Sequence, residues 1–294
     1  MTLTNSKSWL SQAQAGRFAL GAFNANNMEQ VQAIVLAAQA EQAPVIIQFS
    51  HRALAYAGGG RSTLGLRYFA ELGRIAAESV QVPVVLHLDH GSEAEVLQAA
   101  ALGFTSAMFD GGELPFEENV QVTRSLCEAA HAAGMTLEAE IGEVARLNPG
   151  GAPADDGELT DPVLAAEFAK RTGVDALAIA LGSIHGGKKK DIELDLVRLC
   201  TIRSLVSLPL VLHGSSGVTD ANIRQGIELG LCKVNVATQL NQAFTAAVRT
   251  RLAEKPDEVD PRPYLRLATA QMQAVVQERL RFFGVSQKAA GYSN

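Results

Sequence analysis

Short apolar segments alternate with longer segments of helical period along almost the whole chain. Most of the short segments are near-continuous apolar runs, as expected for parallel strands that are buried on both faces. The predicted strands are 17–24, 43–50, 82–89, 104–110, 136–142, 175–184, 208–213 and 232–238.

Helices are predicted between these strands. The clearest are 27–41, 63–80, 116–133, 161–172 and 219–229. Asp161-Pro162 places a proline in a first helical turn, and Thr219 with Asp220 precedes another helix. Eight strands in strict alternation with eight helices favour a closed (β/α)8 TIM barrel of the α/β class. An open doubly wound sheet, which usually has fewer strands, is the alternative.

No linker or low-complexity segment divides the chain, so we predict one domain over residues 1–294. Two long irregular stretches, 51–62 and 144–160, follow strand ends and are typical of binding loops or lids. Residues 261–283 predict an added helix outside the barrel, so the fold carries additional terminal helices.

Composition narrows the class of protein. The 294 residues are 47% apolar and 19% charged, which excludes disorder, and no apolar run approaches the roughly 20 residues that cross a bilayer. There is no export signal, and the three cysteines form no CxxC pair, so we expect a cytoplasmic protein with buried, reduced thiols. A net charge of −6 argues against nucleic acid or a membrane surface as the main partner.

Histidines gather where predicted strands end, and barrel active sites lie at the carboxyl ends of strands. His90, His185 and His213 follow three different strands. Three histidines with room for a water or substrate form the usual catalytic zinc site, where the metal can polarise a carbonyl and stabilise an enediolate. We expect these three to hold Zn²⁺. His87, three residues before His90, would face the other way as a core or supporting histidine.

Carboxylates accompany these histidines. Asp89 precedes a predicted ligand, so it is placed to act as a general acid/base without binding the metal. Asp110 and Glu140, on the fourth and fifth predicted strands, either form a second divalent metal site or hydrogen-bond loop backbone. The pattern leaves both roles open.

Glycine-rich turns after the last strands suit phosphate, because backbone N–H groups there can approach an anion closely. The predicted phosphate cradle consists of Gly214, Ser215, Ser216, Asn235, Val236, Ala237 and Thr238. Gly186 and one of the lysines at 188–190 would complete it, although such a lysine run is also typical of solvated surface.

Several motifs, in this order, resemble class II, metal-dependent ketose-bisphosphate aldolases. They are GAFNANNMEQVQAI, HLDHGS, GFTSAMFDGGELPFEEN, LEAEIG, GSIHG, LPLVLHGSSG, KVNVAT and EKPDEVDPRPYL, and they span nearly the whole chain. The resemblance implies a barrel enzyme of carbohydrate metabolism, in glycolysis or a related route. It would reversibly cleave fructose or tagatose 1,6-bisphosphate to dihydroxyacetone phosphate and glyceraldehyde 3-phosphate.

The resemblance also implies residue roles. His90, His185 and His213 would hold the catalytic zinc, with Asp89 as the acid/base and a second metal position at Asp110 and Glu140. The dihydroxyacetone phosphate part would be bound by Gly186, Gly214–Ser216 and Asn235–Thr238, with Na⁺ or K⁺ nearby.

Four further matches are more peripheral. Asn24 and Ser50 match polar residues near that pocket, and Lys189 keeps a basic position. Arg262 is a candidate for the distant phosphate. The resemblance and the extra C-terminal helix together suggest a homodimer or homotetramer.

Departures from the family pattern concern the loops. Lys188 replaces a usual aromatic residue, Ala154 replaces an acidic one, and Gly112-Glu113 replaces serine-histidine. Loop 143–160 is associated in the family with proton transfer at the enediolate carbon, so Glu143 or Asp155 would have to substitute for the missing acid. The motif NVAT resembles the tagatose type more than the fructose type.

Three alternatives remain open at this point. The chain is an aldolase for another phosphorylated ketose or acceptor aldehyde, or a non-catalytic companion or regulatory barrel subunit, or a metal-dependent barrel hydrolase. The complete ligand set argues against the companion, and the phosphate-type turns argue against the hydrolase.

Overall fold

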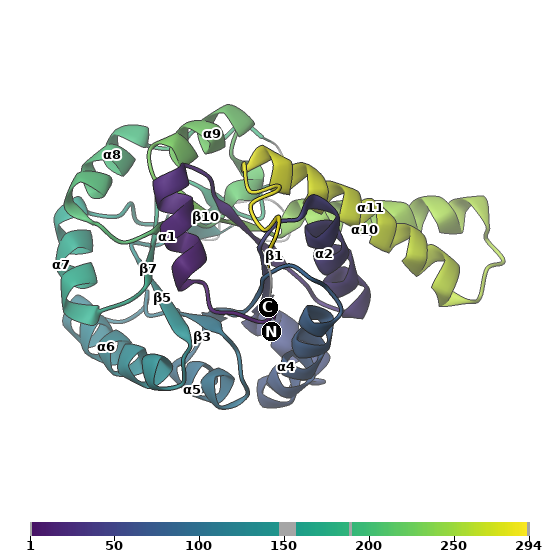
Figure 1. Ribbon diagram of the computed structural model, residues 1–294, viewed down its shortest axis with the longest axis horizontal. Coiled ribbons are helices and arrows are strands. Elements are labelled where there is room, and N and C mark those ends of the chain that lie inside the picture. Colours follow the sequence, from purple (N-terminus) through teal and green to yellow (C-terminus); the bar gives the residue numbers. More distant parts are fainter. Residues whose placement is uncertain (1, 147–156, 188–189, 293–294) are drawn as a thin grey trace.

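Eight parallel strands close into a barrel at the centre of the computed structural model, which describes residues 2–146, 157–187 and 190–292 (Figure 1). The barrel strands are β1 (Leu20–Asn24), β2 (Val45–Ser50), β3 (Val84–Gly91), β4 (Ser106–Phe109), β5 (Thr136–Ile141), β7 (Ala176–Ile179), β9 (Leu210–Leu212) and β10 (Leu231–Val236). Around the barrel their order is β1-β10-β9-β7-β5-β4-β3-β2. The (β/α)8 barrel is confirmed, and the open sheet was the wrong alternative.

A ring of helices covers the outside of the barrel (Figure 1). The helices that follow barrel strands are α2 (Met28–Glu41), α3 (His51–Ala57), α4 (Ser62–Glu78), α5 (Glu93–Ala101), α6 (Phe116–Ala132), α7 (Pro162–Thr172), α8 (Leu196–Leu205), α9 (Asp220–Glu228) and α10 (Thr238–Glu254). Helix α1 (Lys7–Gly16) precedes the first strand, α11 (Pro261–Phe282) follows the last, and a 3₁₀ turn, η1, spans Ser215–Gly217.

Two predicted helix starts have the expected caps. The Asp161 carboxylate accepts hydrogen bonds from the backbone N–H groups of Val163 and Leu164, and Pro162 occupies the first turn of α7. The Thr219 hydroxyl accepts one from the backbone N–H of Asn222. Each cap satisfies N–H groups that the helix itself leaves unpaired, which is typically worth about 1 kcal/mol.

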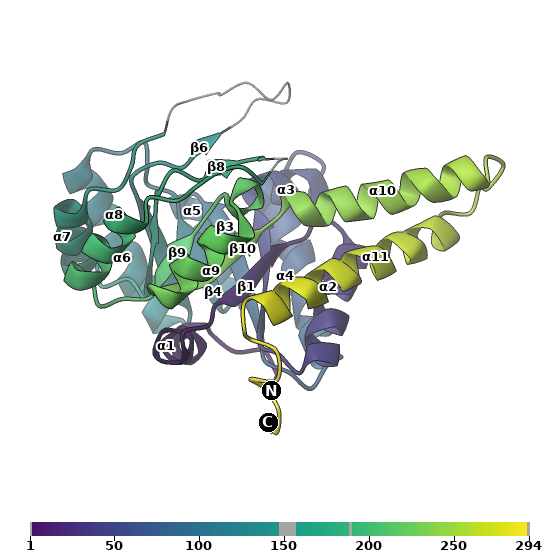
Figure 2. The same cartoon turned by 90° about the horizontal axis from the view of Figure 1, so that it is seen from above.

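Two predictions of local structure were wrong. Residues 51–62 are not one irregular stretch, because α3 begins at His51 and α4 at Ser62. The predicted strand 175–184 is interrupted: β7 ends at Ile179, and Gly182 has a left-handed φ of +92°. The chain then forms a short strand, β8 (Ile184–His185), which pairs with β6 (Ala145–Arg146) at one end of the barrel (Figure 2).

The last two helices form a hairpin that extends away from the barrel (Figure 2). Helix α11 packs against both α10 and α2, so the predicted outer helix at 261–283 is confirmed. Of the cysteines, Cys127 and Cys232 are buried as expected, but Cys200 is exposed on α8. None of the helices in the described ranges is long and apolar enough to cross a membrane.

Candidate active site

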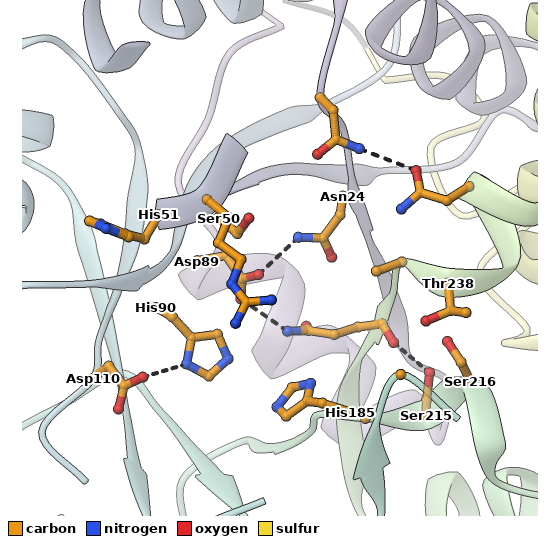
Figure 3. Close-up of a pocket in the computed structure, with 17 residues that line it drawn as sticks. Asn24, Ser50, His51, Asp89, His90, Asp110, His185, Ser215, Ser216 and Thr238 are labelled. Atoms are coloured by element: carbon orange, nitrogen blue, oxygen red, sulfur yellow. Dashed lines mark hydrogen bonds and ion pairs between the residues drawn. The ribbon is translucent and has the colours of Figure 1, made fainter. Parts of the chain in front are cut away.

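A cavity of about 550 Å³ opens at the carboxyl ends of the barrel strands. Its described lining consists of Asn24, Asn26, Ser50, His51, Arg52, Asp89, His90, Asp110, His185, Gly186, Gly214, Ser215, Ser216, Asn235, Ala237, Thr238 and Asn241. Figure 3 shows how these side chains converge from different strand ends. Most of the predicted site residues therefore share one cavity.

Three histidine rings meet in this cavity. One ring nitrogen from each of His90, His185 and His213 lies within 4.8 Å of the others. His213 is fully buried, whereas the other two are partly exposed toward the cavity. The three rings are set edge-on to one another, with interplanar angles of 72–80°. This arrangement directs nitrogens to a common point in place of stacking the rings.

A backbone irregularity places two neighbouring residues of β3 in the same cavity. His90 has a left-handed φ of +53°, and the pairing of β3 with β4 shifts register between Leu88 and Gly91. In a regular strand, Asp89 and His90 would face opposite sides. A non-glycine residue in this conformation costs roughly 1–3 kcal/mol, which indicates that the surrounding structure enforces it.

The Asp89 carboxylate is held by two amides. Asn24 Nδ2 donates to Asp89 Oδ2 at 2.9 Å, and Asn235 Nδ2 donates to Oδ1 at 3.3 Å. Gln48 Nε2 in turn donates to Asn24 Oδ1 at 2.7 Å. Burial raises the pKa of Asp89, but the charges of nearby groups, His90 first, and the Asn24 hydrogen bond lower it below its ordinary value. Asp89 is therefore a fixed, ionised carboxylate at neutral pH.

Beneath the cavity lies a barrel-floor network, which we define as Lys233, Glu138, His213 and His87. Lys233 Nζ donates to Glu138 Oε2 at 2.8 Å and to Oε1 at 3.1 Å. His213 Nε2 lies 2.9 Å from Glu138 Oε1, and His87 Nε2 lies 3.4 Å from Lys233 Nζ. All four side chains are almost completely buried. His87 is thus a core histidine, as predicted.

These contacts determine which ring nitrogen of each histidine faces the possible metal position. A carboxylate only accepts, so His213 donates through Nε2 to Glu138 and keeps a lone pair on Nδ1. Likewise, His90 Nδ1 lies 2.7 Å from Asp110 Oδ2, so Nε2 is the nitrogen that would offer its lone pair to a metal once its proton has left. The two remaining nitrogens, His213 Nδ1 and His90 Nε2, are 3.2 Å apart. Tetrahedral Zn–N bonds of 2.0–2.1 Å would separate two ligand nitrogens by about 3.3 Å, so the residues fit zinc.

Glu140 and Asp110 both lie beside the histidines. Glu140 Oε2 is 3.5 Å from His213 Nδ1, is buried, and has no hydrogen-bond partner among the described residues. Burial raises the pKa of Glu140 to about 7. Burial lowers the pKa of His90, but Asp89, Asp110 and Glu140 together raise it to about 9. The electrostatic field at this point therefore favours a positive charge.

The predicted phosphate cradle also lies at the cavity. Gly214 has a φ of +63°, and a Cβ there would approach the Ile184 backbone to 2.9 Å, so only glycine fits. The Ser215 hydroxyl donates to the backbone carbonyl of Asn235, which ties the turn after β9 to β10. Val236 belongs to the predicted set but is buried in β10 and is absent from the lining.

Some predicted residues do not reach the cavity. Arg262 is on α11, where it pairs with Asp260 and borders a separate surface hollow with Glu29 and Leu265. Arg262 therefore does not reach this cavity within one chain, and its role at the distant phosphate stays a prediction. Lys188, Lys189, Ala154 and Asp155 lie outside the described residues.

Several residues of the site were not predicted. They are Asn26, His51, Arg52 and Asn241 in the lining, and Gln48, Glu138 and Lys233 behind it. A lysine within the apolar strand CKVNV was a usable signal, because a buried ammonium needs a buried partner. His51 and Arg52 belong to the predicted binding loop 51–62, but no motif distinguishes them within that segment.

The fold and the site define a barrel enzyme with a candidate three-histidine metal centre. The family model for class II fructose-bisphosphate aldolase matches residues 4–288. A fructose-bisphosphate aldolase of Geobacillus stearothermophilus is 42% identical, over 99% of this chain and 100% of that protein. A fructose-bisphosphate aldolase from Thermus caldophilus is 40% identical, over 94% of this chain and 96% of that protein. The crystal structure of the YdjI aldolase of Escherichia coli K12 superposes with a TM-score of 0.82 at 32% identity, covering 98% of this chain and 99% of that one.

The chain belongs to the class II fructose-bisphosphate aldolase family and is therefore a carbon–carbon lyase. This family is generally metal-dependent, which agrees with the ring nitrogens that converge at the three-histidine site.

Proposed function

We propose that the protein is a zinc-dependent aldolase that reversibly cleaves a ketose 1,6-bisphosphate to dihydroxyacetone phosphate and glyceraldehyde 3-phosphate. The observation that carries this proposal is the geometry of one cavity. Three histidine nitrogens converge within 4.8 Å, and the amide-held carboxylate of Asp89 lines the same space. His90, His185 and His213 would hold the zinc.

When bound, zinc would supply a Lewis acid that polarises the ketose carbonyl and lowers the barrier to carbon–carbon cleavage. Asp89 would accept the proton of the C4 hydroxyl as the C3–C4 bond breaks, and would return it in the condensation direction. Asn24 and Asn235 would keep its carboxylate oriented. Glu143 or Asp155 remains our proposal for the proton transfer at the carbon next to the carbonyl.

Backbone N–H groups and hydroxyls would bind the phosphate of the dihydroxyacetone part. They belong to Gly186, Gly214–Ser216 and Asn235–Thr238, with Na⁺ or K⁺ nearby, and Lys189 and Ser50 would assist. Such turns suit anions because unpaired N–H groups carry partial positive charge. Asp110 and Glu140 would form a second divalent position, which is supported by the buried Glu140 Oε2, an atom without a hydrogen-bond partner in the described part of the chain.

The names of the relatives favour fructose 1,6-bisphosphate, whereas the motif NVAT keeps the tagatose epimer under consideration. We further propose a cytoplasmic homodimer or homotetramer. The projecting α10–α11 hairpin supports association, because it exposes two long helices away from the barrel.

The test is a cleavage assay on fructose and tagatose 1,6-bisphosphates, with the full-length protein before and after removal of metal. We expect cleavage of at least one epimer, its loss on chelation and its return with Zn²⁺. Absence of cleavage of both epimers by zinc-loaded protein would reject the proposed substrates. Cleavage that persists without any divalent metal would reject the zinc mechanism.

A further inference from the structure

One of the three histidines differs from the other two in its surroundings. The His213 ring is fully buried, whereas His90 and His185 are partly exposed toward the cavity. A buried ring has to find its hydrogen-bond partners inside the protein, because bulk water cannot reach it. The partners of His213 therefore decide which of its two nitrogens carries the proton and which one offers a lone pair to a metal.

Two carboxylates compete for the proton of the His213 ring. Glu138 Oε1 lies 2.9 Å from Nε2, and Glu140 Oε2 lies 3.5 Å from Nδ1. Glu140 Oε2 is buried and has no hydrogen-bond partner within the ranges that the structure describes, so it is available to accept that proton. A proton on Nδ1 would remove the lone pair from the nitrogen that faces the candidate metal position. Metal binding through His213 Nδ1 therefore requires the proton to stay on the side of Glu138.

Lys233 favours this outcome by holding Glu138 in place. Its ammonium has three donors, and three acceptors surround it: the two Glu138 oxygens at 2.8 and 3.1 Å and His87 Nε2 at 3.4 Å. Burial, and then the charge of Lys233, lower the pKa of His87 well below its ordinary value, so this ring is neutral and its Nε2 accepts. The other ring nitrogen, Nδ1, lies 2.8 Å from Ser106 Oγ. The carboxylate is thus fixed on its far side and presents Oε1 to His213.

We propose that Glu138, fixed by Lys233, is a positioning residue that sets the zinc affinity of the site by keeping His213 Nδ1 unprotonated. This inference rests on the proposed zinc-dependent function. Packing alone does not require the ion pair, because an apolar pair of similar volume often fills such a site without loss of stability. A carboxylate behind a metal-binding histidine, in contrast, typically changes metal affinity by about 10- to 100-fold.

The experiment compares two double variants, both of which remove the ion pair. Lys233→Met/Glu138→Gln keeps an acceptor oxygen for His213 Nε2, whereas Lys233→Met/Glu138→Leu removes it. Neither leaves the charge of Lys233 or of Glu138 unpaired, so we expect both to fold, which urea denaturation checks. Competition with a chromophoric chelator then measures the zinc dissociation constant of each full-length protein.

We expect the zinc dissociation constant of Lys233→Met/Glu138→Leu to rise roughly 10- to 100-fold. In Lys233→Met/Glu138→Gln it should rise less than about 5-fold, because a neutral acceptor is weaker than a carboxylate but still binds the Nε2 proton. Equal constants in the two variants would overturn the proposal. Constants that merely follow the urea midpoints would also overturn it, because Glu138 would then act through packing alone.

The matched control is Arg281→Met/Glu41→Leu. It removes a different carboxylate–cation pair, in which Arg281 Nε donates to Glu41 Oε2 at 3.0 Å, and neither residue lines the cavity. The zinc dissociation constant of this variant should equal that of wild type. A rise as large as in Lys233→Met/Glu138→Leu would mean that the loss of any such pair weakens zinc binding, which contradicts a specific role of Glu138.

A second measurement needs neither zinc nor a variant of the ion pair. Nitrogen-15 NMR of the histidine rings in metal-free wild type shows which ring nitrogen is protonated, with the His213 signals assigned by their loss in His213→Asn. We expect the proton on Nε2, and a proton on Nδ1 would overturn the proposal. Failure of wild type to bind zinc would instead reject the proposed function, and the NMR spectrum separates that result from a failure of Glu138 to hold the His213 proton.

Discussion

The barrel floor and the cavity rim differ in how their charges are used. On the floor, Lys233, Glu138 and His213 are nearly inaccessible to solvent and each has a partner inside the barrel. On the rim, Arg52 is exposed and its charge has no partner among the described residues. Buried polar groups must be satisfied internally, whereas exposed ones remain free for ligands. The floor therefore uses its charges to hold the barrel interior together, whereas the rim keeps a charge exposed to the cavity.

The largest effect should come from breaking the floor. Lys233→Met leaves the Glu138 carboxylate buried without its counter-charge, so we expect a loss of about 3–5 kcal/mol in the free energy of unfolding. Urea denaturation measures it. The control is Lys7→Met, because Lys7 pairs with Asp175 but is mostly exposed, and its removal should cost less than about 1 kcal/mol. Similar losses in both variants would contradict the expectation that the buried Lys233–Glu138 pair matters more to stability than an exposed pair.

Asp89→Asn should lower cleavage activity without changing the metal content. The amide cannot accept the hydroxyl proton as a base, so cleavage should fall about 10²- to 10⁴-fold. Metal content, measured by elemental analysis, should not change, because Asp89 is not a proposed ligand. A fully active variant would remove Asp89 from the mechanism. Loss of the metal would instead make it part of the metal centre.

A pH titration tests the pair Glu41–Arg281, which lies outside both the floor and the rim. Burial raises the pKa of Glu41, but hydrogen bonds from Arg281 and Ser286 lower it below its ordinary value. This pairing stabilises the fold above the ordinary carboxyl pKa and is lost as pH falls through the lowered value. Between pH 7 and pH 3, the urea midpoint of wild type should therefore fall more steeply than that of Glu41→Gln. Parallel curves would show that the pair contributes nothing.

The smallest effect should come from the rim. Arg52→Gln should change the free energy of unfolding by less than about 0.5 kcal/mol, because no described contact is lost. Thermal denaturation without ligand checks this. A loss of several kcal/mol would mean that the side chain supports the fold, and the contrast between floor and rim would disappear.

The sequence predicted the three histidines of the candidate metal centre better than the residues of the rim. His90, His185 and His213 were identifiable because scarce histidines stand at strand ends beside glycines, where barrels place their ligands. The tautomers of His213 and His90 could not be predicted, because they depend on contacts with Glu138 and Asp110 from other strands. The left-handed conformation of His90 could not be predicted either, since nothing in the local residue types requires it.

His51 and Arg52 of the rim were not predicted as site residues, because no motif includes them. His51 and Arg52 lie between a strand and a glycine-rich turn, a context that resembles a loop. Only the register of β2 against its neighbours, which aligns Ser50 with Asp89, brings this segment to the cavity. Arg262 is the converse case: its motif suggested the site, but α11 carries it to another surface of the same chain.

The most direct test of the central claim is a zinc titration of metal-stripped protein, followed by release of dihydroxyacetone phosphate from the preferred bisphosphate. We predict no activity without metal, a linear rise with added Zn²⁺ and a plateau at about one ion per chain, as three histidines with one open position require. Full activity in the metal-free protein, together with a covalent adduct trapped by borohydride, would contradict the account.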